Sequence, residues 1–289
     1  MAMVSALMCS LVGTFVKIAS TAVSPNVITF SRFFFGSLTI LLLCLFTKRK
    51  PKLHYKNIWI WIAIVSKCLN YFLENYALRN GTSYGNIICT PMQMVTICLC
   101  SAFFFGEKFG PRKLLSVILC ITGILFISGN GRPVGAVDTV SLKMTVLFVI
   151  AGIGAGGFVL AQKRMLDEME PIDMNLSVFL ASSLIAFVPV SAEYDRVPDI
   201  GLPPLLALIG LGIITGAAFV LLAKSMKKLS LLTAGMAQNS TPVFTLLWGA
   251  MFWHETIGPY VIIGTILFII GMVLFNVAPE PDAEKTDTQ

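Results

Sequence analysis

The feature that most constrains this sequence is a series of ten apolar runs, separated by short segments that carry charges or turn residues. A helix needs about 20 apolar residues to cross the hydrocarbon core of a bilayer. The runs cover 2–20, 25–46, 57–78, 83–105, 112–128, 143–162, 173–191, 203–223, 230–252 and 258–277. They predict an all-α polytopic membrane protein with ten transmembrane helices, because transmembrane β-strands would be shorter and alternate in polarity.

The composition points to the same class. Only 12% of the 289 residues are charged and 56% are hydrophobic, whereas a soluble domain carries about 25% charged residues. So few charges cannot cover the surface of a soluble protein of this size. The composition therefore argues against a soluble enzyme, a nucleic-acid partner and a disordered chain, and it makes the lipid bilayer the main surroundings of the protein.

The distribution of basic residues predicts the orientation. With a cytoplasmic N-terminus, the inner loops and tail hold 14 of the 21 Lys and Arg residues, and the outer loops and helix ends hold 4. Cytoplasmic loops of membrane proteins are enriched in Lys and Arg. We therefore expect both termini in the cytoplasm, in a multi-pass protein of the plasma membrane, as in a bacterial inner membrane. The net charge of +6 is then a signal of topology.

The two halves of the chain align at an offset of 148 residues. FFFGEKFGPRKLLSVILCITGILF (103–126) falls on MFWHETIGPYVIIGTILFIIGMVL (251–274), with a shared E-x-x-G-P. Each half contains five runs, an odd number, so the second half would enter the membrane from the opposite side. We expect inverted five-helix repeats over 1–130 and 131–278, and a disordered cytoplasmic tail over 279–289. Secondary transporters are often built this way, with the substrate site near the midplane.

The order and spacing of several motifs resemble the drug/metabolite transporter superfamily, in its EamA-type branch. These motifs include GTFVKIA (13–19), YALRNGTS (76–83), FGE (105–107) and STPVFTLLWGAMFWHE (240–255). Val12 stands where the family often has tryptophan. The resemblance implies two five-helix repeats and transport, most often outward, of amino acids, metabolites, sugars, nucleotide derivatives or toxic compounds.

The third run carries a polar stripe. Lys67, Asn70, Tyr71 and Glu74 are spaced i, i+3, i+4 and i+7, so they share one helix face. Ionisable groups inside a membrane usually face the bundle interior. Lys67 is expected either to bind an anionic group of the substrate or to be buried without its charge. Glu74 is the candidate for proton coupling.

Arg32 in the second run lies at a depth similar to that of Glu74, since both are a few residues from the outer ends of neighbouring antiparallel helices. We expect the two side chains to pair. Two interpretations are open: a permanent bridge between the helices, or a pair that lines the cavity and exchanges with a charged substrate or a proton.

Pro91 and Pro242 fall within the fourth and ninth runs, where a proline would kink a helix and free a backbone carbonyl. Nearby amides could complete a polar lining, or they could be bonded to neighbouring helices beside a simple kink. The expected substrate site comprises Arg32, Lys67, Asn70, Tyr71, Glu74, Gln93, Gln238, Asn239 and Trp248. Glu107 and Glu255, which precede Gly-Pro helix starts, are interpreted as caps.

The expected function is secondary active export of a small metabolite, such as an amino acid, an organic acid or a related compound, by alternating access. Lys17, Arg32 and Lys67 outnumber Glu74 inside the runs, which favours a substrate with an anionic group. No cofactor, metal or enzymatic activity is expected, protons are candidate partners, and the protein is a monomer or a homodimer. The alternatives are a channel, for which no filter-like segment is found, and a membrane-embedded lipid-modifying enzyme, for which the two distant histidines at 54 and 254 are a poor match.

Overall fold

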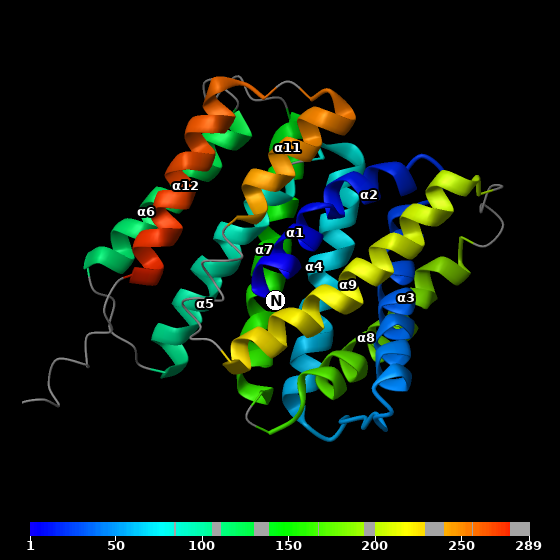
Figure 1. The fold of residues 1–289 in the computed structure, drawn as a ribbon. Helices are drawn as coiled ribbons and strands as arrows, with labels where there is room; N and C mark the ends of the chain where they lie inside the picture. The colour runs from blue at the N-terminus through cyan, green and yellow to red at the C-terminus, as the bar shows by residue number, and fades with distance from the viewer. Residues whose placement is uncertain are drawn as a thin grey trace, which may run out of the picture.

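The computed structural model describes residues 1–83, 85–105, 111–129, 139–166, 168–193, 200–228, 240–255 and 257–277. Within these ranges the ordered elements are helices and no strand occurs, which confirms the all-α class (Figure 1). The tail over 279–289, the boundary between the expected repeats at 130–131, and Glu107 lie outside the described residues.

The helices overlap the apolar runs of the sequence. In chain order they are α1 (Ala2–Ser10), α2 (Val12–Ala19), α3 (Pro25–Phe46), α4 (Ile58–Asn80), the short 3-10 helix η1 (Gly85–Ile88), α5 (Cys89–Phe105), α6 (Pro111–Gly129), α7 (Thr139–Met165), α8 (Pro171–Ser191), α9 (Leu202–Lys228), α11 (Thr241–Trp253) and α12 (Pro259–Val277). Two starts follow from local chemistry: Ser24 and Asn57 accept backbone hydrogen bonds at the N-termini of α3 and α4.

The sequence predicts a single α-helix for the first run and for the fourth run. The structure differs from this prediction in both cases. The first is divided at Leu11, whose N–H donates to the Met8 carbonyl at 3.2 Å, the tighter pattern of a 3-10 turn. In the fourth run, η1 precedes α5, which begins at Cys89. Pro91 is therefore the third residue of α5, and Pro242 is the second residue of α11.

Pro91 therefore does not interrupt a continuous α-helix. The residues before Ser240 lie outside the described ranges, so the kink expected at Pro242 stays a prediction. A proline in the first helical turn costs no intrahelical hydrogen bond, because the first N–H groups of a helix have no partner within it. Both prolines lie at the described helix starts.

The long helices lie side by side, and the chain turns at two ends of the bundle (Figure 1). One end carries the loop 47–57 and the turn between α7 and α8; we call it the 47–57 end. The other carries the turn Ser20–Ser24 and the junction of α4 with η1; we call it the 20–24 end.

Close packing depends on glycines where helices cross. α4 lies along α7, α3 contacts both α8 and α9, and α6 pairs with α12 beside the rest of the bundle (Figure 1). A Cβ atom on Gly154 of α7 would lie 2.7 Å from the Ser66 carbonyl oxygen of α4. A Cβ atom on Gly123 of α6 would lie 2.6 Å from the Gly264 carbonyl oxygen of α12. Small residues of this kind let membrane helices approach closely.

Four helices of the described chain are long and apolar enough to cross a membrane by length and composition: 25–46, 139–165, 171–191 and 202–225. The outward faces of these helices carry large apolar side chains, among them Leu184, Val188 and Leu206, which are 73%, 67% and 56% exposed. Apolar surface on this scale is typical of contact with lipid.

Candidate functional site

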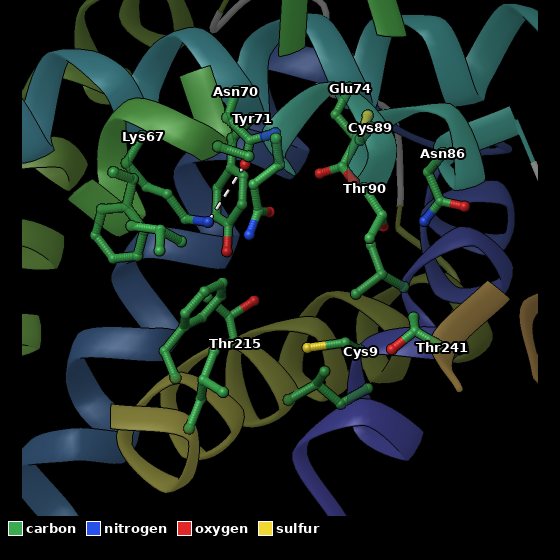
Figure 2. A pocket seen from close by; sticks show the side chains of 18 of the residues that line it. Cys9, Lys67, Asn70, Tyr71, Glu74, Asn86, Cys89, Thr90, Thr215 and Thr241 are labelled. Atoms are coloured by element: carbon green, nitrogen blue, oxygen red, sulfur yellow. Dashed lines mark hydrogen bonds between the residues drawn. The ribbon is translucent and has the colours of Figure 1, made fainter. Parts of the chain in front are cut away.

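A cavity of about 150 Å³ lies inside the bundle. The elements that line it are α1, α2, α3, α4, η1, α5, α7, α9 and α11. Its lining contains three charged side chains, Arg32, Lys67 and Glu74, among several neutral polar groups. Figure 2 shows Lys67 and Glu74 at this cavity. A concave site with a few converging polar groups is the usual form of a small-molecule site.

The polar face of α4 lies at this cavity. Lys67, Asn70, Tyr71 and Glu74 all line it, and each is at most 8% exposed. The helical spacing places these four side chains on one face of α4, and that face forms one wall of the cavity. Arg32 reaches the same space from α3.

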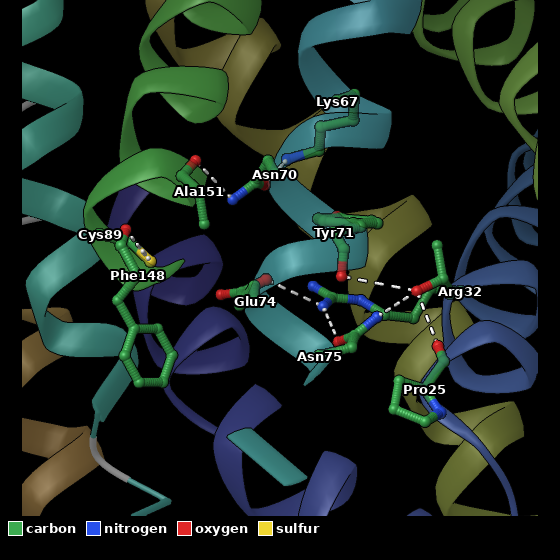
Figure 3. A network of polar contacts seen from close by, with 11 residues as sticks. Pro25, Arg32, Lys67, Asn70, Tyr71, Glu74, Asn75, Cys89, Phe148 and Ala151 are labelled. Carbon is green, nitrogen blue, oxygen red and sulfur yellow. Dashed lines mark hydrogen bonds and ion pairs between the residues drawn. The ribbon is translucent and has the colours of Figure 1, made fainter. Parts of the chain in front are cut away.

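Arg32 and Glu74 form the pair expected from their depth. Nη1 of Arg32 lies 3.0 Å from Oε2 of Glu74, and the same nitrogen donates to Oδ1 of Asn75 at 2.8 Å (Figure 3). Asn75 in turn donates through Nδ2 to Thr29 at 2.8 Å, and the guanidinium carbon of Arg32 lies 3.6 Å from the centre of the Tyr71 ring. The Arg32 charge is thus held on three sides.

Lys67 is surrounded by aromatic rings. Its Nζ lies 3.9 Å from the ring centre of Phe219, 4.3 Å from that of Tyr71 and 4.7 Å from that of Phe158. It donates one hydrogen bond, to Oδ1 of Asn70 at 3.3 Å, and Asn70 is fixed by donating to the Ala151 carbonyl at 3.0 Å. No carboxylate of the described residues lies within 4.0 Å of Nζ. Cation–π contacts of this type stabilise a desolvated ammonium.

Four polar atoms of the cavity residues are buried without a hydrogen-bond partner in the described part of the chain: Arg32 Nε, Tyr71 Oη, Asn86 Oδ1 and Thr215 Oγ1. Buried polar atoms are paired in the great majority of cases. Their accumulation around one cavity indicates a place where a bound solute or water completes the hydrogen bonding.

The other expected site residues are distributed differently. Gln93 and Pro242 line the cavity, whereas Trp248 does not. The indole Nε1 of Trp248 instead donates to Ser10 Oγ at 2.9 Å and joins α11 to α1. Gln238 and Asn239 lie outside the described residues.

Several cavity residues were not identified from the sequence. Asn86 and Thr90 come from η1 and the start of α5, Thr215 from α9 and Thr241 from α11. Phe158 and Phe219 complete the rings around Lys67. None belongs to a polar stripe, so helical spacing gave no signal for them.

The two halves of the chain also meet at both ends of the bundle. At the 20–24 end, Glu255 accepts hydrogen bonds from the N–H and the hydroxyl of Ser83. Beside this contact, within the first half, Lys17 donates to the Gly81 carbonyl. The interpretation of Glu255 as a simple helix cap is therefore incomplete. At the 47–57 end, Nη2 of Arg49 lies 2.7 Å from Oδ2 of Asp173.

Comparison with known proteins gives a consistent result. The EamA-like transporter family model matches residues 1–129 and again 142–277. An uncharacterised transporter of Bacillus subtilis, YoaV, is 23% identical over 266 residues, which cover 89% of this chain and 89% of that protein. The UDP-galactose translocator 1 of Caenorhabditis elegans is 21% identical over 227 residues, covering 70% of this chain and 62% of that protein.

A solved crystal structure has the same fold. It superposes with a TM-score of 0.70 at 16% sequence identity, and the match covers 96% of this chain and 98% of that one.

Proposed function

Because the chain belongs to the EamA-like transporter family, and is accordingly a membrane transporter, we propose that it is a secondary active transporter that exports a small metabolite by alternating access. The observation that carries this proposal is the cavity, a polar, charged space enclosed by helices of both halves of an otherwise apolar bundle. Polar and ionisable groups are costly inside a membrane and mark substrate pathways.

Alternating access requires two bodies that move about a central site, and in this proposal they are inverted five-helix repeats over 1–130 and 131–278, with ten transmembrane helices. Three observations support it. The family model matches the chain twice. The helices α6 (Pro111–Gly129) and α12 (Pro259–Val277) have equal lengths and begin 148 residues apart. Cys120 Sγ and the Phe268 carbonyl oxygen, at equivalent positions, lie 4.0 Å apart, as expected near a two-fold axis.

The orientation follows from charge. The loop 47–57 is rich in Lys and Arg, so the 47–57 end is proposed to face the cytoplasm and the 20–24 end the outside. Both termini are then cytoplasmic, in the plasma membrane of a bacterium. The contacts of Ser83 with Glu255 would close the outer side in the present state of the protein.

The substrate-binding residues in this proposal are Arg32, Lys67, Asn70, Tyr71, Glu74 and Gln93, which line the cavity. Gln238 and Asn239 remain proposed members of the site by their sequence position. Trp248 is proposed to act indirectly, because it holds α11 against α1 through Ser10. Glu74 is the proposed proton-coupling group, since its protonation would release Arg32.

Counterflow in proteoliposomes tests the function. Vesicles loaded with an unlabelled solute should accumulate the labelled solute transiently and saturably, and empty vesicles should not. A channel would give flux that does not saturate and shows no counterflow. Turnover of a lipid without movement of solute would instead identify an enzyme.

A further inference from the structure

The proposed function does not specify the chemical class of the solute. The following proposal rests on that function, because it concerns the same cavity. We propose that the cavity takes a small organic monoanion, with a carboxylate at the Lys67 side and a neutral hydroxyl group at the Asn86 side. An amino acid or a nucleotide sugar fits the described lining less well.

The charges of the cavity favour a net negative solute. Arg32 and Glu74 neutralise each other at 3.0 Å. Lys67 contacts rings and one amide oxygen, and among the described residues no carboxylate lies within 4.0 Å of it. With Lys67 protonated, the described lining thus carries one positive charge that no described carboxylate compensates. A buried charge is favourable only when it is paired, so a solute with a single negative charge completes the site.

The groups around Lys67 are suited to a carboxylate. An ammonium has three N–H donors, and Lys67 uses one of them on Asn70. The buried hydroxyls of Tyr71 and Thr215 neighbour each other and face the cavity on the Lys67 side (Figure 2), and neither makes a hydrogen bond of good geometry within the described chain. Three sets of donors therefore converge on one region, while the rings of Phe158 and Phe219 hold the ammonium in place.

The opposite side suits a neutral hydroxyl group. Asn86 and Thr90 lie across the cavity from Lys67, and Asn86 points Nδ2 toward the cavity and Oδ1 away from it (Figure 2). An amide nitrogen is a donor, so the oxygen of a solute hydroxyl would accept from Nδ2 without adding charge.

The volume of the described cavity favours a small solute. A cavity of about 150 Å³ is comparable to an engineered protein cavity that holds benzene, so the solute has roughly six to eight non-hydrogen atoms. A nucleotide sugar is several times larger. An amino acid of this size would bring an ammonium group, for which the described lining offers Glu74, already bonded to Arg32.

A matched series of short solutes tests this proposal on the purified full chain. γ-Hydroxybutyrate carries one negative charge, γ-aminobutyrate is a zwitterion of the same size, and γ-hydroxybutyramide is neutral; further short hydroxy acids and their amino and amide counterparts extend the series. At saturation the hydroxy acids should raise Tm by roughly 5 °C, and the zwitterions and amides should leave it unchanged. Binding restricted to zwitterions, neutral compounds or amines would overturn the proposal, as would failure of every hydroxy acid to bind.

Two variants locate the binding. Lys67→Met should abolish the shift with hydroxy acids, whereas Lys163→Met, the same change at an exposed position of α7, should retain it. Asn86→Ala should weaken γ-hydroxybutyrate about tenfold and leave butyrate, which lacks the hydroxyl, unaffected. Equal loss for both acids, or hydroxy-acid binding unchanged in Lys67→Met, would contradict the assignment.

Flux measurements separate this inference from the proposed function. An anion that binds as expected but shows no counterflow would refute transport and leave the site assignment intact. Counterflow of a zwitterion or a cation without binding of anions would support transport and refute the monoanion.

Discussion

Glu255 accepts two hydrogen bonds from Ser83, one from the backbone N–H at 2.8 Å and one from the hydroxyl at 2.7 Å. The residues lie 172 positions apart, in different halves of the chain. Ser83 is three residues before Asn86 of the cavity lining. This contact therefore links the two halves at the 20–24 end, close to the proposed binding site.

Removing the Glu255 carboxylate should favour a state in which the outer side is open. Spin labels at Asn80 and Met251, both exposed positions at this end, report the separation of the halves by pulsed electron paramagnetic resonance. Glu255→Ala should increase the population with the longer distance. Ser83→Ala, which keeps the backbone donor, should have a smaller effect. Identical distance distributions in all three proteins would mean that the contact does not control opening.

The buried pair of Arg32 and Glu74 should matter more for stability than any exposed charge. Removing one partner of a buried pair leaves the other uncompensated, at a cost of about 3–5 kcal/mol. Arg32→Met and Glu74→Leu should each lower the thermal stability in detergent strongly, and the double variant should recover most of the loss. Arg79→Met, at an exposed position, should change the free energy of unfolding by about 0.5 kcal/mol or less. Additive losses in the double variant would show that the pair is not coupled.

Glu74→Gln tests proton coupling separately from stability, because the amide oxygen of glutamine can still accept a hydrogen bond from Arg32. If Glu74 takes up and releases the coupled proton, the variant should perform counterflow without responding to a pH gradient. Asn75→Asp, next to it on the side of Arg32, should retain the response. Full gradient-dependent transport by Glu74→Gln would rule out this residue as the coupling group.

Gly154 should not tolerate a side chain. A Cβ atom there would lie 2.7 Å from the Ser66 carbonyl oxygen and 2.9 Å from the Asn70 backbone nitrogen. Gly154→Ala would therefore push α7 from α4, at a cost of about 1–3 kcal/mol, and displace a wall of the cavity. Gly201→Ala is the matched control, because its nearest neighbours would be 3.9 Å away. Comparable thermal stability of the two variants would contradict the close packing of α4 and α7.

The sequence predicted those parts of the site that depend on the periodicity of a single helix. Lys67, Asn70, Tyr71 and Glu74 share a face because of the helical period, and the facing depth of Arg32 followed from helix rise. Their places at the cavity agree with that reasoning. The all-α class followed from the apolar runs for the same reason, since each run is read on its own.

The remainder of the site depends on tertiary packing. Asn86 lies on η1, and Thr215 and Phe219 lie on α9, so only the packing of these elements with α4 brings them to the cavity that Lys67 lines. At Pro91 a local pattern was present but misleading. The apolar residues around Pro91 predict a continuous helix, whereas the chain changes from η1 to α5 two residues before it. Ser83 and Glu255 meet through a contact that no local pattern indicates.

Access to the cavity from both sides of the membrane is the central requirement of the proposed mechanism. Thr90 lines the cavity and is partly exposed, so Thr90→Cys, in a protein whose seven natural cysteines are replaced, is a direct probe. A charged, membrane-impermeant thiol reagent should label this cysteine in right-side-out and in inside-out vesicles, and a bound solute should slow both reactions. Labelling from one side alone, in the presence and absence of solute, would contradict alternating access.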